Sequence, residues 1–474
     1  MHDPMTFEAR LADAMGRYAD LAPLSVDAAA VTRAVAADRA SGLRGRWNAS
    51  LGRSWATVFV LLALLVLTAA GAALVGAVLL RSDPITGPHG VFVPTGSMLE
   101  ARIDATATRL PDGRVLIAGG WSRFRAAQGD EGTDVDGQAL ATAELFDPGT
   151  ESFSPTGSMG QARRDATATL LADGRVLFAG GFGSAPTADG GMNLREVLDS
   201  AEIFDPSTGT FSPAGAMTSS RALHSATILP DGTVLLVGGL GSVGGELPTA
   251  PGTSPLDSVE SFDPSTQTFR SITAPMHTGR FEPTSSILRD GRVLIVGDAG
   301  SLPVADIYDP ITETFTEVPA TGAGATARAA ALLPDGRVLL TGEGLRSDGT
   351  RTLTPSWQLF DATTEAFTDV EPAGGFGDVA VPLPDGRILV MGAPPFGLGL
   401  PVEPTSQVYD PDTSGIVDVG PPTDARESGQ TATLLQDGRV LVAGGRLGES
   451  QDVGSTTNPP YAYVAYDHAE LFHP

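Results

Sequence analysis

Cysteine and lysine are both absent from this chain of 474 residues, and histidine occurs only six times. Without cysteine the chain can form no disulfide and no thiolate metal site, so cysteine usage does not indicate a compartment. All thirty basic residues are arginine, and they face 56 acidic residues for a net charge of −26. A chain this acidic repels nucleic-acid phosphates, so we expect no nucleic-acid partner.

Enzyme and metal-site motifs are missing as well. No nucleophile-elbow, phosphate-loop or dinucleotide-binding pattern occurs in a strand-to-helix setting. The histidines form no His-x-His or His-x₃-His pair that could supply two metal ligands. Asp130, Asp134 and Asp136 are weak calcium candidates, because their loop lacks the first and the closing acid of a calcium-binding loop. We therefore expect no metal, no cofactor and no catalytic activity.

An eleven-residue motif recurs seven times at spacings of 45 to 61 residues, a period typical of propellers and solenoids. In each copy, Asp-Gly separates an apolar run from a run rich in leucine and β-branched residues. This pattern predicts a β-hairpin with a two-residue type I′ turn. The copies are LPDGRVLIAGG (110–120), LADGRVLFAGG (171–181), LPDGTVLLVGG (229–239), LRDGRVLIVGD (288–298), LPDGRVLLTGE (333–343), LPDGRILVMGA (383–393) and LQDGRVLVAGG (435–445).

A second motif follows each hairpin and leads through a polar turn to a short aromatic strand. Its copies are ELFDP (144–148), EIFDP (202–206), ESFDP (260–264), DIYDP (306–310), QLFDA (358–362), QVYDP (407–411) and ELFHP (470–474). The hairpin, this motif and the aromatic strand give four strands per repeat, which is the pattern of a propeller blade.

The two motifs resemble those of the kelch family of β-propellers over residues 90–474. The diglycine is altered in units four to six, at Gly297-Asp298, Gly342-Glu343 and Gly392-Ala393. The resemblance implies an all-β propeller of seven blades. Kelch-like copper oxidases use a tyrosine cross-linked to cysteine beside histidine ligands. The resemblance therefore also implies that this cofactor cannot form in a chain without cysteine.

The first 53 residues have helical periodicity, with an amphipathic stripe over residues 6–21. They form either a solvated tail or a docking segment for a cytoplasmic partner. Trp55–Leu80 follows as a run of uncharged residues long enough to cross a bilayer. Arg44, Arg46 and Arg53 precede this run, so the positive-inside rule places the N-terminus in the cytoplasm and the propeller outside.

We therefore expect a cell-membrane protein with a single signal-anchor span and four segments. They are a cytoplasmic helical segment (1–53), a transmembrane helix (54–81), a linker (82–89) and the propeller (90–474).

The propeller begins and ends in the middle of a repeat. Residues 90–98, GVFVPTGSM, match ESFSPTGSM (151–159) around the fourth strand of the first repeat, whereas the chain ends on the third strand of the seventh. We therefore predict that Val91–Pro94 completes the seventh blade and leaves no open sheet edge. This closure places the tight turns nearer the membrane. The long loops between second and third strands, in units one, two, three and seven, lie on the other face.

Arginines recur ten residues before the Asp of Asp-Gly in units one to four, and eleven before it in unit seven. The same units carry an acid in the second motif, whereas units five and six have Gln358 and Gln407 there and lack the arginine. This co-occurrence favours a structural clamp between the first and third strands over a ring of cations for an acidic ligand. The predicted pairs are Arg102–Glu144, Arg163–Glu202, Arg221–Glu260, Arg280–Asp306 and Arg426–Glu470.

Polar residues also stand seven positions before the same Asp in units three, five, six and seven. The resemblance implies that this position lies near the mouth of the central channel. The candidate binding residues are therefore His224, Arg328, Asp378 and Gln430, and the alternative is a solvated channel lining.

These features predict an extracytoplasmic propeller that binds a protein or a glycan on its long-loop face and catalyses nothing. Two alternatives remain. The chain could be a transmembrane regulator, loosely similar to anti-sigma-type proteins, with the propeller as sensor and residues 1–53 as the segment for a cytoplasmic factor. That segment has no His/Cys zinc motif. The other alternative is an enzyme in the channel, which would need a metal.

Overall fold

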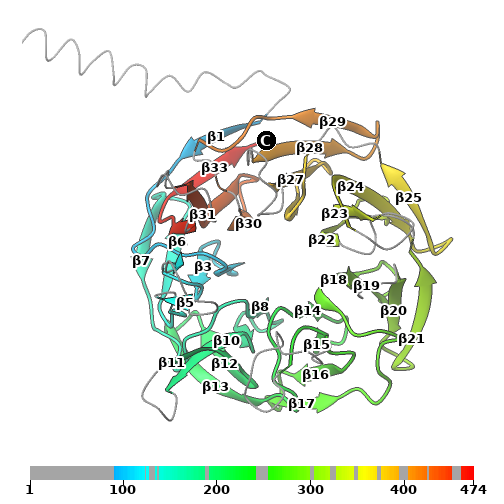
Figure 1. Ribbon diagram of the computed structural model, residues 1–474, viewed down its shortest axis with the longest axis horizontal. Coiled ribbons are helices and arrows are strands. Elements are labelled where there is room, and N and C mark those ends of the chain that lie inside the picture. The colour runs from blue at the N-terminus through cyan, green and yellow to red at the C-terminus, as the bar shows by residue number, and fades with distance from the viewer. Residues whose placement is uncertain are drawn as a thin grey trace, which may run out of the picture. The chain divides into compact units, whose positions relative to one another are not determined.

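The computed structural model shows a ring of antiparallel sheets in the second of the chain's two units, Met1–Thr86 and Gly87–Pro474 (Figure 1). The residues that it describes are 90–122, 124–126, 134–135, 138–186, 192–241, 255–298, 304–320, 327–345, 351–370, 375–393, 404–423, 426, 428–450 and 461–474. The predicted cytoplasmic segment, transmembrane helix and linker lie outside these residues. Within the described part, no helix has the length and apolarity that crossing a bilayer requires.

Seven blades of four strands each make up the ring, as the repeats predict. We letter the strands a to d from the axis outward and number the blades from the one that contains β2. The a strands, innermost in Figure 1, are β2 (Thr106–Arg109), β8 (Thr167–Leu170), β14 (Ser225–Ile228), β18 (Phe281–Ile287), β22 (Ala327–Leu332), β26 (Val379–Pro382) and β30 (Ser428–Leu434). The b strands are β3 (Val115–Ala118), β9 (Val176–Ala179), β15 (Val234–Val237), β19 (Val293–Asp298), β23 (Val338–Leu345), β27 (Ile388–Gly392) and β31 (Val440–Ser450).

The c strands carry the second motif, and the d strands form the outer wall. The c strands are β6 (Ala143–Asp147), β12 (Ser200–Asp205), β16 (Val259–Asp263), β20 (Val304–Asp309), β24 (Arg351–Asp361), β28 (Thr405–Asp410) and β33 (Ala469–His473). The d strands are β7 (Ser152–Pro155), β13 (Thr210–Ala216), β17 (Thr268–Ser271), β21 (Thr314–Pro319), β25 (Ala366–Val370), β29 (Gly415–Asp418) and β1 (Val91–Pro94).

Hydrophobic cores lie between neighbouring blades rather than inside one sheet. Between blades 2 and 3, for example, Leu177 and Ile203 of one blade pack with Val234, Leu236 and Phe262 of the next. The b strand is buried on both faces, because it is sandwiched between a and c and covered by blades on either side. This environment explains why the motif after Asp-Gly is a continuous apolar run rather than an alternating one.

The Asp-Gly hairpins differ from the predicted type I′ turn. In blade 1, the N–H of Gly113 donates to the carbonyl of Leu110 at 3.0 Å, which closes a four-residue turn with Pro111 and Asp112 at its centre. Only Gly113 has a positive φ, +93°, and Asp112 does not. Proline fixes a negative φ at the first central position, so the chain forms a type I turn followed by a left-handed glycine.

Several of the connections between b and c strands contain strands where the sequence analysis expected loops. In blade 2 the connection forms a hairpin of β10 (Phe182–Pro186) and β11 (Met192–Val197). In blade 7, β31 continues into a pairing with β32 (Tyr461–Ala465). β32 also pairs with β4 (Phe124–Ala126) of blade 1, and β4 pairs with β5 (Asp134–Val135). Blades 7 and 1 therefore share a sheet above the ring on the loop face.

The ends of the chain close the ring. β1 pairs antiparallel with β33, with Phe92 opposite Phe472 and Val93 opposite Leu471. The rings of Phe92 and Phe472 lie 5.0 Å apart, and they reproduce the aromatic pair that Phe146 and Phe153 form at 4.9 Å within blade 1. The prediction that the seventh blade is made from both ends of the propeller is confirmed.

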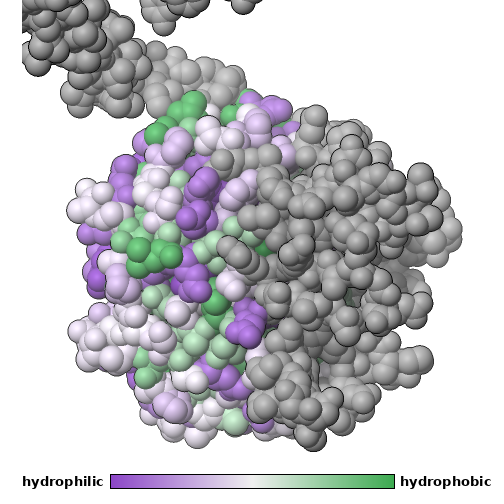
Figure 2. Space-filling model, turned by 60° about the vertical axis from the view of Figure 1, so that its left-hand side comes forward, coloured by the Kyte–Doolittle hydropathy of each residue, from purple (hydrophilic) through white to green (hydrophobic). Residues whose placement is uncertain are grey.

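The outer wall mixes hydrophilic and hydrophobic side chains where Figure 2 shows it. In β7 the aromatic residue is partly buried and the residues on either side of it are exposed. β7 therefore gains its packing mainly from one aromatic contact with the c strand, whereas the longer outer strands β13 and β21 also bury Ala214 and Val318.

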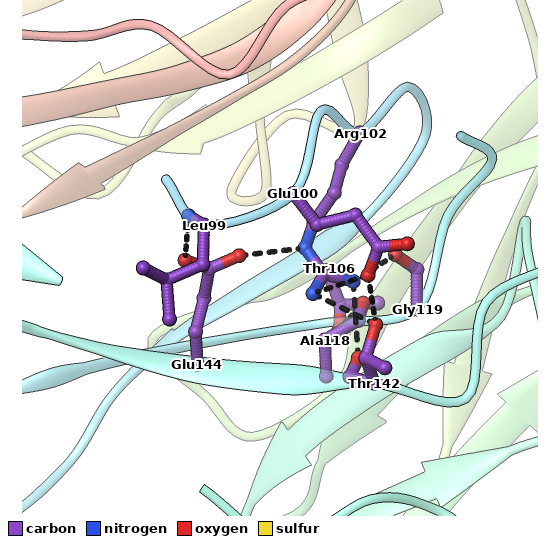
Figure 3. Close-up of polar contacts among 8 residues, drawn as sticks. All are labelled: Leu99, Glu100, Arg102, Thr106, Ala118, Gly119, Thr142 and Glu144. Carbon is purple, nitrogen blue, oxygen red and sulfur yellow. Dashed lines mark hydrogen bonds and ion pairs between the residues drawn. The ribbon is translucent and has the colours of Figure 1, made fainter. Parts of the chain in front are cut away.

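A buried ion pair joins the start of the a strand to the c strand in five blades. In blade 1, Nε of Arg102 donates to Glu144 at 2.9 Å, and its NH1 donates to the carbonyls of Gly119 and Thr142 (Figure 3). Glu144 also accepts the backbone N–H of Leu99 at 2.7 Å. The pairs and their N–O distances are Arg102–Glu144 (2.9 Å), Arg163–Glu202 (2.9 Å), Arg221–Glu260 (2.8 Å), Arg280–Asp306 (2.6 Å) and Arg426–Glu470 (3.1 Å).

Four of these arginines also link their blade to the one before it through the diglycine. The backbone N–H of Gly120 donates to the carbonyl of Arg163 at 3.1 Å, and equivalent bonds join blades 2 to 3, 3 to 4 and 7 to 1. A side chain on Gly119 would meet the Arg163 carbonyl at 2.5 Å. The diglycine is therefore needed at these four junctions. Blades 4 and 5, which lack the second glycine, precede the two blades without the arginine, whereas Gly392-Ala393 of blade 6 precedes a blade that has Arg426.

We predict that Glu260→Gln destabilises the protein, because it leaves the guanidinium of Arg221 buried without its counter-charge. The expected loss is about 3–5 kcal/mol in the free energy of unfolding, measured by denaturant titration of the full chain in detergent. The double variant Arg221→Met/Glu260→Gln should lose less than Glu260→Gln alone, because no unpaired charge remains. A Glu260→Gln protein as stable as the wild type would contradict the clamp.

We predict that Phe92→Ala weakens the closure of the ring. Loss of the contact with Phe472 should lower the free energy of unfolding by about 2 kcal/mol. Val93→Ala is the matched control on the same strand. Its side chain is 43% exposed, so its loss should stay below about 1 kcal/mol. Equal losses for the two variants would show that the aromatic pair does not stabilise the closing strand.

Candidate axial binding site

A pocket of about 460 Å³ opens at the axis of the ring, on the face that carries the b–c connections. Its wall is built mainly from the segments that lead into the a strands, which converge on the axis in Figure 1. Every blade contributes to it. Each blade supplies one ionisable residue to the wall. In blade order these are Asp104, Asp165, His224, Glu282, Arg328, Asp378 and Arg446.

Three of the four candidates from the sequence lie at this pocket. His224, Arg328 and Asp378 line it, whereas Gln430 does not, although its neighbours Ser428 and Gly429 do. The sequence analysis missed Asp104, Asp165, Glu282 and Arg446.

A backbone feature explains which acids the sequence analysis missed. Asp104, Asp165, Leu223 and Glu282 occupy one repeated position, two residues after the clamp arginine, and have φ values between +46° and +54°. This left-handed conformation turns the chain at the axis, just before the a strand. The turns also bond to one another, since the N–H of Leu223 donates to the carbonyl of Asp165 at 3.1 Å. The signal in the sequence is an acid in three of these four repeats at a position that favours glycine or asparagine.

Two of these acids, Asp104 and Asp165, come from adjacent blades and repel one another. Burial, together with the charge of Asp104, raises the pKa of Asp165 to about 7. Burial also raises the pKa of Asp104, against the lowering effect of Arg446 and Arg164. One of the two carboxyl groups is therefore partly protonated near neutral pH.

Arg164 holds Asp165 in place from outside the pocket. Its NH1 lies 2.6 Å from Asp165, and its guanidinium stacks 3.5 Å from the ring centre of Trp121 and 4.5 Å from that of Phe182. A guanidinium held between two rings and a carboxylate has little freedom to move, so it fixes one wall of the site.

His224 presents a neutral imidazole to the pocket. Its Nε2 lies 3.0 Å from the hydroxyl of Thr167, and its side chain is only 6% exposed. Burial, and then the charge of Arg221, lowers the pKa of His224 to about 3. Among the described residues, its Nδ1 has no hydrogen-bond partner.

The opposite side of the pocket contains a second ion pair. Arg328 of blade 5 lies 3.3 Å from Asp378 of blade 6, and these side chains are 36% and 16% exposed. The pair joins the two blades that lack the buried clamp, at a place where solvent still reaches both charges.

The turn face also has hollows, each of which is lined by an Asp-x-Arg pair. One of about 480 Å³ lies between blades 4 and 5 and is lined by Asp335 and Arg337, which lie 2.6 Å apart. The same Asp-x-Arg pair recurs in other turns, for example as Asp173–Arg175 at 2.7 Å. We interpret these pairs as part of the turn structure.

The described residues do not form a metal site. Among them, no group of three or more histidine, cysteine, aspartate or glutamate side chains is placed to hold a metal ion. Of the weak calcium candidates, Asp130 and Asp136 lie outside the described residues, and Asp134 is described only as backbone of β5.

Comparison with known proteins gives a match in structure alone. No protein-family model and no curated protein matches the sequence. A solved structure described as a novel fungal alcohol oxidase of the AA5 family, in complex with copper, is similar at a TM-score of 0.55 and 19% identity. The match covers 81% of this chain and 76% of that one. The likeness shows the fold alone, a seven-bladed β-propeller.

Proposed function

We propose that this protein is a membrane-anchored, extracytoplasmic binding protein that takes a protein partner on its loop face and has no catalytic activity. The observation that carries the proposal is the axial pocket, because every blade contributes to it and its wall is polar and charged. A rigid ring that collects variable side chains at one point is a common way to build a binding site.

The likeness to a copper oxidase supports the fold and not the chemistry. The chain has no cysteine for a cross-linked tyrosine, and the described residues supply no group of metal ligands. The residues that are present therefore do not fit that copper centre, and we derive no redox step for this protein.

The anchor and its orientation rest on the sequence. The uncharged run Trp55–Leu80 and the arginines before it support a single span with the propeller outside. In that arrangement β1 is the first strand after the linker, and it starts on the turn face of the propeller.

The orientation can be tested with single cysteines, because the chain has none of its own. Thr316→Cys places a thiol on the exposed surface of β21, and Ser25→Cys places one before the apolar run. A membrane-impermeant maleimide should label Thr316→Cys in intact cells and Ser25→Cys only after lysis. The reverse pattern, or equal labelling of both variants in intact cells, would contradict the proposed orientation.

The binding site can be tested with a photo-crosslinking amino acid in growing cells. At Ser428, which lines the pocket, p-benzoylphenylalanine should give one discrete adduct with a second polypeptide, identified by mass spectrometry. The same residue at Thr316, on the outer wall, is the matched control and should not give that adduct. No protein adduct at Ser428, or the same adduct at both sites, would contradict a protein partner at the pocket.

A further inference from the structure

We propose that the axial pocket receives a positively charged side chain of arginine type from the partner. This inference rests on the proposed function, because it names the group that the pocket would recognise. Four carboxylates line the pocket. Two guanidinium groups line it as well, and a third, that of Arg164, lies just outside it and pairs with Asp165. With four carboxylates against three guanidinium groups, the ionised site has a net negative charge.

The geometry of the carboxylates suits an organic cation better than a metal ion. The acids come from four different blades and surround the cavity, and no three of the described carboxylate or histidine side chains are close enough to share a metal ion. A planar guanidinium, with five N–H donors on a long stem, can reach several separated acceptors at once. A cavity of about 460 Å³ has room for such a side chain.

A second feature of the wall points to a ligand that donates hydrogen bonds. His224 is more than nine-tenths buried beside the acids, and its Nδ1 has no partner among the described residues. The imidazole is neutral. We assign its proton to Nε2, which then donates to the hydroxyl of Thr167 and leaves Nδ1 as an acceptor. Carboxylates and a neutral imidazole together form a wall that accepts hydrogen bonds.

The whole exported part of the chain has the matching charge. Residues 81–474 contain 23 arginines and 50 acidic residues, a net charge of −27. A field of this sign attracts basic partners over distances of about a Debye length, before any contact forms. A glycan without charge would gain nothing from this field, which favours a basic protein segment.

Binding of a cation should be coupled to release of a proton from the pair Asp104 and Asp165. Asp165 faces Arg164 on its own segment, and the charged groups around it from other blades are Asp104, Glu282 and Arg446, with the neutral His224 beside them. Of these groups, Asp165 has a pKa near 7, whereas the pKa of His224 is about 3 and the guanidinium groups stay charged. Asp165 is mostly neutral at pH 5.5 and ionised at pH 8, so the affinity for a cation should rise across this range.

The test compares N-acetyl-arginine amide with N-acetyl-citrulline amide, which has the same shape and no charge. Calorimetry on the full chain in detergent should show one arginine site per chain, with an affinity on the order of tenfold higher at pH 8 than at pH 5.5. The citrulline compound should bind at least tenfold more weakly at pH 8. Equal binding of both compounds, or no binding of either, would overturn the inference.

Variants connect this binding to the acids. Asp104→Asn/Asp165→Asn should lower the affinity for the arginine compound at least tenfold and remove its pH dependence. Asparagine tolerates the left-handed backbone at both positions, so these changes should keep the turn, as circular dichroism and the melting temperature would verify. Glu317→Gln, an exposed acid on β21, is the charge-matched control and should bind like the wild type. A double variant that is folded and binds normally would overturn the inference.

The outcome is distinct from that of the crosslinking experiment. If a protein adduct forms at Ser428 while the arginine compound does not bind, the pocket is a partner site and its assignment to a cation is wrong. If no adduct forms and the arginine compound binds, the pocket recognises a free cationic molecule, and the protein partner is wrong.

Discussion

The ring depends on a small buried group: one arginine, one carboxylate and the diglycine of the neighbouring blade. The guanidinium of Arg163 pairs with Glu202 in its own blade, while its backbone carbonyl accepts the N–H of Gly120 from the blade before. One residue therefore fixes the strand order within a blade and the contact between two blades. Burying the charge is costly, and the cost is offset only when every donor and acceptor is matched. This requirement explains why the arginine and the acid are present or absent together in all seven blades.

Much of the fold follows from the sequence because its determinants are local and repeated. Seven Asp-Gly hairpins, with a strand motif after each, set the number of blades, and the split repeat at residues 90–98 predicts the closure. The turn type was mispredicted. Pro111 excludes the mirror-image turn in blade 1, but the same turn forms in blade 2, which has Ala172 at this position, so the loop closes one residue later than the Asp-Gly pair alone suggests. The strands within the b–c connections are not repeated from blade to blade, and pairings such as β32 with β4 join segments far apart in the chain.

The residues of the pocket are harder to predict from the sequence than the fold is. His224, Arg328 and Asp378 could be found because the a strand runs close to the axis in propellers. Asp104 and Asp165 stand one residue earlier, where the chain turns through a left-handed conformation that no spacing rule reports. Arg446 reaches the same place from β31 in the last blade, so its position depends on the completed ring. A site at the axis is lined by residues from every repeat. These residues differ from blade to blade, so the repeated motifs do not predict them.

The two faces of the ring differ in how far the blades resemble one another. On the turn face, pairs such as Asp173–Arg175 neutralise their own charges within a single hairpin. On the loop face, the connections differ between blades, and charges from different blades meet at the axis. A repeat protein can change its ligand by exchanging exposed residues on one face while its buried ion pairs keep the blades in place.

The pairing of β1 with β33 also sets the order in which the molecule can be completed. Strand β1 is the first strand of the propeller to be synthesised, and its partner β33 is the last. Until β33 has been made, β1 has no sheet to join. The ring can therefore close only after all seven repeats have been synthesised, and the loss of β33 would open the ring and expose the edge of β31.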